Sequence, residues 1–122
     1  MEYSRALSNF LAEVQTPAYV CELEKLEANL KLLKEIKDKS SCKILLALKG
    51  FAMHSTFELV SSYLDGATCS GLHEAHLADE TLNGEVHTYS PAFKAQEIEA
   101  IAKLSDDIVF NSPHNLNAFM RK

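Results

Sequence analysis

Lys49 is the residue of this sequence best placed to do chemistry, because it directly follows the uninterrupted apolar run of residues 44–48. Such a run is typical of a β-strand covered on both faces, as in a parallel sheet. Ligands of parallel α/β folds gather at the carboxyl ends of the strands, so we expect Lys49 at the mouth of the sheet, partly desolvated. Desolvation disfavours the ammonium form of a lysine, and the neutral amine is the nucleophile that Schiff-base chemistry with an aldehyde cofactor requires. Position alone leaves a second interpretation open, because a lysine that closes a strand more often points to solvent.

A second group of reactive side chains comprises Cys69, His73 and His76, with Glu74 between the histidines. The two histidines are three residues apart and would share one face of a helix. Their spacing matches no standard zinc pattern, because His-Glu-x-His is one residue shorter than His-Glu-x-x-His. We therefore predict no metal site, and we expect Glu74 to be a helix-start or hydrogen-bonding residue rather than a catalytic acid.

The elements that must position these residues alternate along the chain. Helical apolar spacing predicts helices at 6–14, 24–37, 53–64, 72–82, 94–104 and from Pro113, with Ser112 as the cap of the last. Short β-rich runs predict strands at 18–21, 43–49, 67–70, 86–90 and 108–110. Five successive β-α units indicate a parallel sheet. An open doubly wound sheet would be complete at this length, whereas a barrel needs eight units and roughly 250 residues, and spacing does not choose between them.

Composition excludes several classes of protein. The 122 residues are 47% hydrophobic and 24% charged, as in ordinary globular domains. A net charge of −5 argues against a nucleic-acid partner, and no apolar run approaches the roughly 20 residues that span a bilayer. Three widely spaced cysteines, Cys21, Cys42 and Cys69, fit reduced thiols. We therefore expect a cytoplasmic protein without a membrane or nucleic-acid partner.

Five strings carry a resemblance to a known family: TPAYV at 16–20, LLALKGFA at 45–52, TCSGLHEA at 68–75, HTYSPAFK at 87–94 and IVFNS at 108–112. The lysine strand resembles that of the fold-type III enzymes that depend on pyridoxal 5'-phosphate (PLP). Taken together and in this order, the strings resemble the carboxynorspermidine (carboxyspermidine) decarboxylase family. The resemblance implies an α/β fold of parallel β/α units, namely the N-terminal part of a PLP-binding TIM-type (β/α)8 barrel.

The resemblance also assigns roles to residues. It implies that Lys49 forms the Schiff base with PLP, and that the turn containing Ser70 lines the cofactor cleft, where Ser70 and Gly71 permit close backbone approach. Asn111 ends the last predicted strand at the same mouth and is expected to bind the cofactor. We expect Lys94 to be a surface residue at a helix start. The pair Asp106-Asp107 precedes a strand, at the wrong end for catalysis, and we expect it to be solvated.

The family is larger than this chain. Its glycine-rich phosphate segment, the acidic partner of the pyridine nitrogen and its C-terminal β-domain would all lie beyond Lys122. We therefore expect residues 1–122 to be an incomplete N-terminal portion of the barrel domain, with negligible activity alone. The full-length enzyme would be a homodimer acting on a carboxylated polyamine. Two alternatives remain open, a non-catalytic PLP-binding barrel protein and an unrelated flavodoxin-like module.

Overall fold

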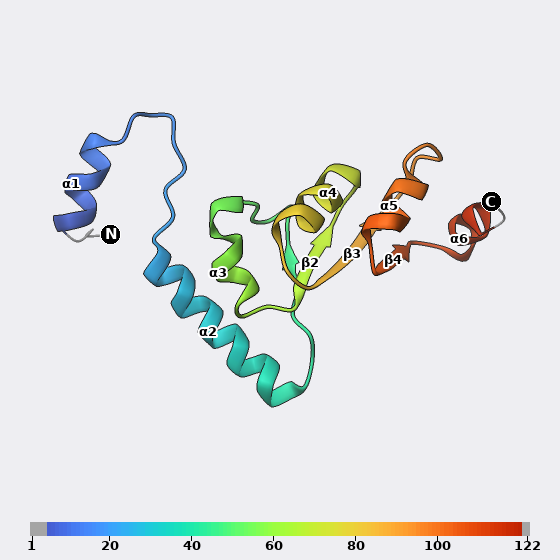
Figure 1. Ribbon diagram of the computed structural model, residues 1–122, viewed down its shortest axis with the longest axis horizontal. Coiled ribbons are helices and arrows are strands. Elements are labelled where there is room, and N and C mark those ends of the chain that lie inside the picture. Colours follow the sequence, from blue (N-terminus) through green and yellow to red (C-terminus); the bar gives the residue numbers. More distant parts are fainter. Residues whose placement is uncertain (1–4, 121–122) are drawn as a thin grey trace.

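Four parallel strands, paired in chain order, form the sheet of the computed structural model, which describes residues 5–120 (Figure 1). They are β1 (Leu46–Ala47), β2 (Gly66–Cys69), β3 (Glu85–Ser90) and β4 (Asp107–Phe110). Ala47 pairs with Thr68, Thr68 with His87, and His87 with Asp107. The predicted parallel α/β architecture is confirmed. The predicted range 1–122 also includes residues 1–4 and 121–122, which lie outside the described part.

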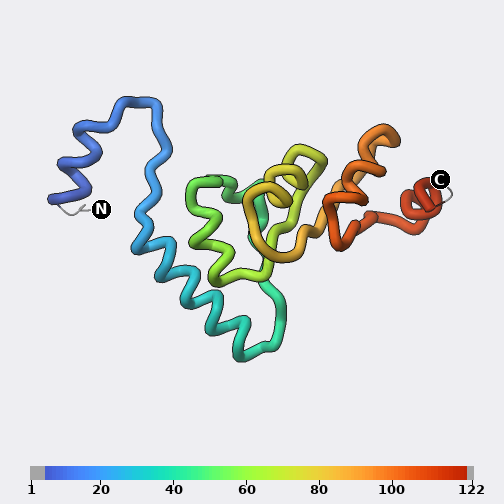
Figure 2. Tube along the Cα trace, viewed as in Figure 1, coloured from blue at the N-terminus to red at the C-terminus, as the bar shows by residue number. Residues whose placement is uncertain are grey.

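Helical segments precede, connect and follow the strands. They are α1 (Arg5–Glu13), α2 (Leu23–Ser40), the 3₁₀ turn η1 (His54–Thr56), α3 (Phe57–Ser61), α4 (Leu72–Thr81), α5 (Ile98–Leu104) and α6 (Pro113–Phe119). Ser112 caps α6 as predicted, because its hydroxyl accepts the N–H of Asn115. Figure 2 shows α1 at one end of the molecule, joined to α2 by an extended stretch of chain. Within residues 5–120, no helix is both long enough and apolar enough to cross a membrane.

The hydrophobic core lies between the sheet and the helices that follow β1 and β2. Phe57 and Val60 of α3 are each 1% exposed, and Ala75 and Ala78 of α4 are wholly buried. Leu30 brings α2 into the same cluster. Alanine on the inner face of α4 lets the helix backbone approach the sheet closely, which fixes the start of this helix relative to the end of β2.

Several predicted elements differ from the structure. The helix predicted at 94–104 begins only at Ile98, and the helix predicted at 53–64 is the 3₁₀ turn η1 followed by the short α3. Residues 18–21 form no strand, because no strand within the described residues lies beside them to form hydrogen bonds. Tyr19 is accordingly 97% exposed. The run at 43–49 is apolar as a strand should be, yet only Leu46–Ala47 is paired as β1. The chain turns directly afterwards, since the N–H groups of Gly50 and Phe51 both donate to the carbonyl of Ala47.

Two aspartates accept hydrogen bonds from backbone N–H groups at the amino ends of the strands. Asp65, just before β2, accepts the N–H of Ile44 at 2.9 Å and the ammonium of Lys37 at 3.0 Å. Asp106, just before β4, accepts the N–H of Val86 at 2.8 Å. Asp106 and Asp107 are both exposed, as expected, but Asp106 also accepts a backbone N–H. Sequence could not show this bond, because the N–H belongs to a residue of the preceding strand, 20 residues away.

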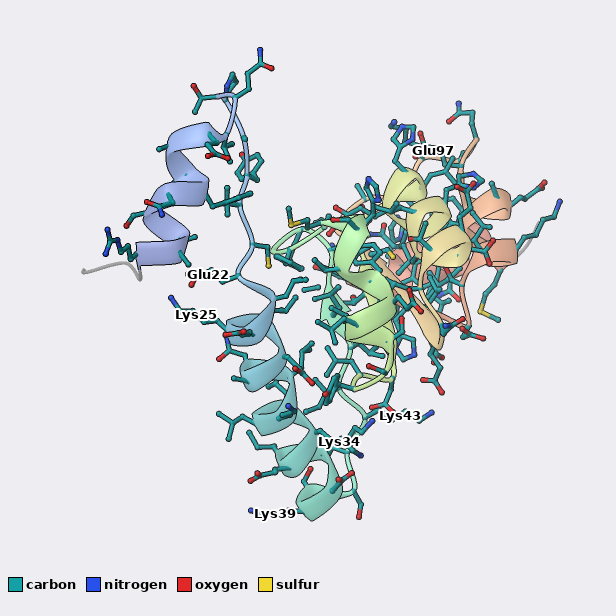
Figure 3. All side chains as sticks on the ribbon, turned by 60° about the vertical axis from the view of Figure 1, so that its left-hand side comes forward. Glu22, Lys25, Lys34, Lys39, Lys43 and Glu97 are labelled. Carbon is teal, nitrogen blue, oxygen red and sulfur yellow. The ribbon has the colours of Figure 1, made fainter. Side chains whose placement is uncertain are left out.

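A chain of charges runs across the same end of the sheet. Lys43 binds Glu85, whose second oxygen lies 3.1 Å from Nε2 of His87, and that nitrogen lies 3.2 Å from a carboxylate oxygen of Asp107. The ammonium of Lys43, and then His87, lower the pKa of Glu85. Figure 3 shows Lys43 far from Glu97, which lies at the opposite end of the strands.

Replacement of Asp65 by alanine should destabilise the chain by about 1–2 kcal/mol, because a half-buried N–H and an ammonium lose their acceptor. Urea unfolding followed by circular dichroism measures the loss. Asp38→Ala is the matched control, since Asp38 only forms an exposed pair with Lys34 one turn away on α2. Equal stability of the two variants would contradict the role of Asp65.

The contribution of Asp65 should also depend on pH. The N–H of Ile44, followed by Lys37, lowers the pKa of Asp65. A carboxyl with a lowered folded pKa stabilises the fold above its unfolded pKa of about 3.9 and loses that contribution as the pH falls through the folded value. The stability difference between the parent and Asp65→Ala should therefore be constant from neutral pH down to about pH 5 and narrow in stronger acid. A difference that grows on acidification would refute this assignment.

Gly84 should tolerate no side chain, because its φ is +113° and an added Cβ would lie 2.2 Å from the carbonyl oxygen of Asp65. Gly84→Ala is expected to lower the thermal unfolding midpoint by several degrees. Gly71→Ala serves as the control for the fold, since an added Cβ there meets nothing within 4 Å. Similar midpoints for the two variants would show that the close approach at Gly84 is not needed.

Candidate functional site

The carboxyl ends of the four strands share one edge of the sheet, and the three predicted site residues lie along it. Lys49 follows β1, Ser70 follows β2 and Asn111 follows β4. All three are exposed in the chain. The topology therefore brings the predicted residues to one mouth, as parallel pairing requires.

Lys49 is placed by the last bond of the β1 ladder. The N–H of Leu48 donates to the carbonyl of Thr68 at 3.1 Å, and the Leu48 side chain is only 3% exposed. Leu48, Lys49 and Gly50 form the turn, so the chain leaves the core here and presents Lys49 to the mouth. The expected partial desolvation is not found, because nothing within residues 5–120 covers this side chain.

The ammonium of Lys49 is also unpaired. Within the described residues it has neither an ion pair nor a side-chain hydrogen bond, whereas the other lysine of the mouth, Lys94, binds Glu97 at 2.8 Å. Lys94 is exposed, as predicted, but it is not at a helix start, because α5 begins only at Ile98. Within the described residues, Lys49 is therefore unpaired at this edge, whereas Lys94 is paired.

A large cleft lies beside Lys49. Its volume is about 820 Å³, and its walls are residues 19–29 on one side and residues 50–53, directly after Lys49, on the other. Phe51, Met53 and Leu26 make it largely apolar. Glu22 and Lys25, which also line it, form an ion pair 2.7 Å long. Figure 3 labels both residues at the start of α2. The sequence alone did not predict this cleft, because the residues of its two walls are about thirty positions apart in the chain.

A smaller cleft of about 330 Å³ lies between the ends of β2 and β3. Ser70, Gly71 and Glu74 line one side, and Phe93 and Lys94 belong to the other. Ser70 therefore lines a cavity, as the resemblance implies. Neither Lys49 nor Asn111 is among the residues that line either cleft.

The turn at Ser70 is held by Glu74. One carboxylate oxygen of Glu74 accepts the N–H of Ser70 at 2.6 Å, which fits the predicted hydrogen-bonding role. Burial, and to a smaller extent the charge of Glu74, raise the pKa of Cys69 to about 11. Cys69 is 2% exposed, and burial together with the raised pKa makes its thiol a poor nucleophile.

Asn111 is fixed by the first turn of α6. The side-chain oxygen of Asn111 accepts a hydrogen bond from the side-chain amide of Asn115. The backbone N–H of Asn115 in turn donates to the Ser112 hydroxyl. The preceding residue, Phe110, packs against Phe93 with ring centroids 5.2 Å apart. This aromatic contact ties the end of β4 to the loop that follows β3.

Comparisons with known proteins agree with this arrangement. No family model matches the chain. It is 51% identical over 113 residues to the carboxynorspermidine/carboxyspermidine decarboxylase of Campylobacter jejuni subsp. jejuni, covering 93% of this chain and 30% of that protein. It is 39% identical over 106 residues to the enzyme of the same name from Herminiimonas arsenicoxydans, covering 87% and 29% of the two chains. A carboxyaminopropylagmatine decarboxylase from Synechocystis is 38% identical over 102 residues, with 84% of this chain and 26% of that protein covered.

A crystal structure of carboxynorspermidine decarboxylase from Campylobacter jejuni, complexed with norspermidine, has a TM-score of 0.85 and 52% identity. The match covers 88% of this chain and 29% of that one. The chain thus spans about 30% of the length of the curated relatives it matches first. By sequence and by fold, it is a homologue of the N-terminal part of the carboxynorspermidine/carboxyspermidine decarboxylases.

Proposed function

We propose that this chain supplies the cofactor lysine of a PLP-dependent decarboxylase that converts carboxynorspermidine or carboxyspermidine into norspermidine or spermidine. One observation carries the proposal: Lys49 presents an exposed amine, unpaired within residues 5–120, at the carboxyl end of β1 in a chain 51% identical to a named decarboxylase. An amine in that position is the group that condenses with an aldehyde.

The residues around Lys49 fit PLP in chemical type. Lys49 would hold the aldehyde carbon, while the Ser70 hydroxyl and the Asn111 amide would hydrogen-bond to polar atoms of the cofactor. Gly71 leaves open space at the turn, since a Cβ there would meet nothing within 4 Å, so a ligand can approach the backbone. When bound, PLP supplies an electron sink for the bond that loses carbon dioxide.

The protein's own groups would then orient the substrate and move protons. Lys49, in its ammonium form, would supply the proton that replaces the lost carboxylate at the substrate α-carbon. The apolar walls of the larger cleft, such as Phe51 and Met53, would exclude water from the neighbourhood of that carbon.

The substrate class rests on the relatives. The structural neighbour holds norspermidine, and two curated relatives are named for carboxynorspermidine and carboxyspermidine. A net charge of −5 suits a polycationic ligand. We further propose that the full-length enzyme is a cytoplasmic homodimer and that residues 1–122 form only part of its barrel domain.

The assignment of Lys49 can be tested in a chimera in which this chain replaces the matching 113 residues of the Campylobacter jejuni decarboxylase. Reduction with borohydride in the presence of PLP should leave a stable adduct on Lys49, found by peptide mapping. Lys49→Arg should abolish the adduct and lower decarboxylation of carboxynorspermidine by at least about a thousandfold. Lys94→Met is the matched control at the same edge, and it should keep the adduct. An adduct on any other lysine would overturn the assignment.

The 122-residue chain alone should release no carbon dioxide from carboxynorspermidine, because it spans only 30% of the relatives' length and leaves both edges of the sheet open. A coupled assay for carbon dioxide, run beside the chimera, measures this. An adduct without carbon dioxide release in the chimera as well would favour the non-catalytic PLP-binding alternative.

A further inference from the structure

We propose that Glu74 is a positioning residue of the cofactor site, which acts by holding the turn of residues 69–71 through the Ser70 N–H. The inference rests on the proposed function, since it concerns the turn on which the cofactor contact of Ser70 depends. Glu74 itself is not assigned any contact with the cofactor or the substrate.

The Ser70 N–H has no partner in the sheet. The last paired residues of β1 and β2 are Ala47 with Thr68, and the final bond on that side runs from the Leu48 N–H to the Thr68 carbonyl. β1 then turns away, so the backbone of Ser70 extends past the end of its neighbour. The carboxylate of Glu74, 2.6 Å away, takes the place of the missing strand.

The bond connects the turn to a rigid support. Glu74 lies in the first turn of α4, and Ala75 and Ala78 of that helix are wholly buried against the core. The residue that caps this helix, Gly71, has no side chain and makes no capping bond. Glu74 reaches back from the first turn of α4 to the N–H of Ser70, the residue before the cap, as the glutamate of a capping box reaches back to the cap. This charge-assisted bond ties the turn to a helix that cannot shift without disturbing the core.

The location of the charge agrees with this role. Glu74 and Ser70 line the same cleft of about 330 Å³, and the carboxylate adds to the burial that raises the pKa of the neighbouring Cys69 thiol. A bond of this length between a carboxylate and an N–H fixes the direction of the Ser70 backbone, and with it the place of the Ser70 Cβ at the cleft wall. Loss of the bond would free the turn without removing any predicted ligand of the cofactor.

The test uses the chimera with the Campylobacter jejuni decarboxylase and compares three replacements of Glu74. Glu74→Ala removes the acceptor, Glu74→Asp shortens it by one methylene, and Glu74→Gln keeps an oxygen at the same reach. Absorbance titration gives the dissociation constant of PLP, and the absorption spectrum of the bound cofactor reports its environment. We expect the alanine and aspartate variants to bind PLP about tenfold more weakly with an altered spectrum, and the glutamine variant to restore most of the affinity.

Glu80→Ala is the control on the same helix, since Glu80 is exposed and far along α4 from the turn. It should bind PLP like the parent. A Glu74→Gln variant as weak as Glu74→Ala, or a Glu74→Ala variant with parental affinity and spectrum, overturns the inference while leaving the Lys49 adduct intact. Absence of the adduct in the parent chimera would instead refute the proposed function. Should Glu74→Ala fail to fold, the aspartate and glutamine variants still decide the question.

Discussion

The backbone bond from the Leu48 N–H to the Thr68 carbonyl is the constraint on which the candidate site depends. It is the last backbone hydrogen bond between the end of β1 and β2, and it holds Leu48 where its side chain is buried in the core. A chain that is fixed at Leu48 and turns at Gly50 has one residue left to present at the mouth, and that residue is Lys49. The reactivity proposed for this amine is thus a consequence of where a short strand ends.

The opposite end of the sheet is stabilised by hydrogen bonds and ion pairs of charged side chains. Asp65 and Asp106 each accept the N–H of a residue in or just before the neighbouring strand, and the Lys43, Glu85, His87 and Asp107 side chains continue the network across β3 and β4. Charged groups therefore stabilise the amino ends, while the carboxyl ends keep Lys49 unpaired. This division matches the rule for parallel α/β folds, in which one end serves stability and the other serves chemistry.

The exposure of Lys49 and Tyr19 is understandable from the extent of the chain. Homologous decarboxylases are more than three times as long, and the described residues contain four strands with both edges of the sheet open. A side chain that would be covered in a closed barrel is exposed here. In the full-length enzyme that we propose, further segments would contribute to both clefts at the mouth.

The sequence by itself determined the order of the elements, the parallel sheet and the candidate lysine, because apolar periodicity and strand-end position are local properties of residues such as 44–49. It also indicated the family through five ordered strings, which the comparisons confirm; the roles of Ser70 and Asn111 stay predictions. Only the tertiary structure decided that 18–21 is no strand, that Asp106 accepts a backbone N–H, and that Glu74 holds Ser70. The clefts, the short β1 ladder and the aspartate bonds depend on residues far apart along the chain, and the Glu74 bond depends on the three-dimensional path of a turn. Local pattern carries no information about these contacts.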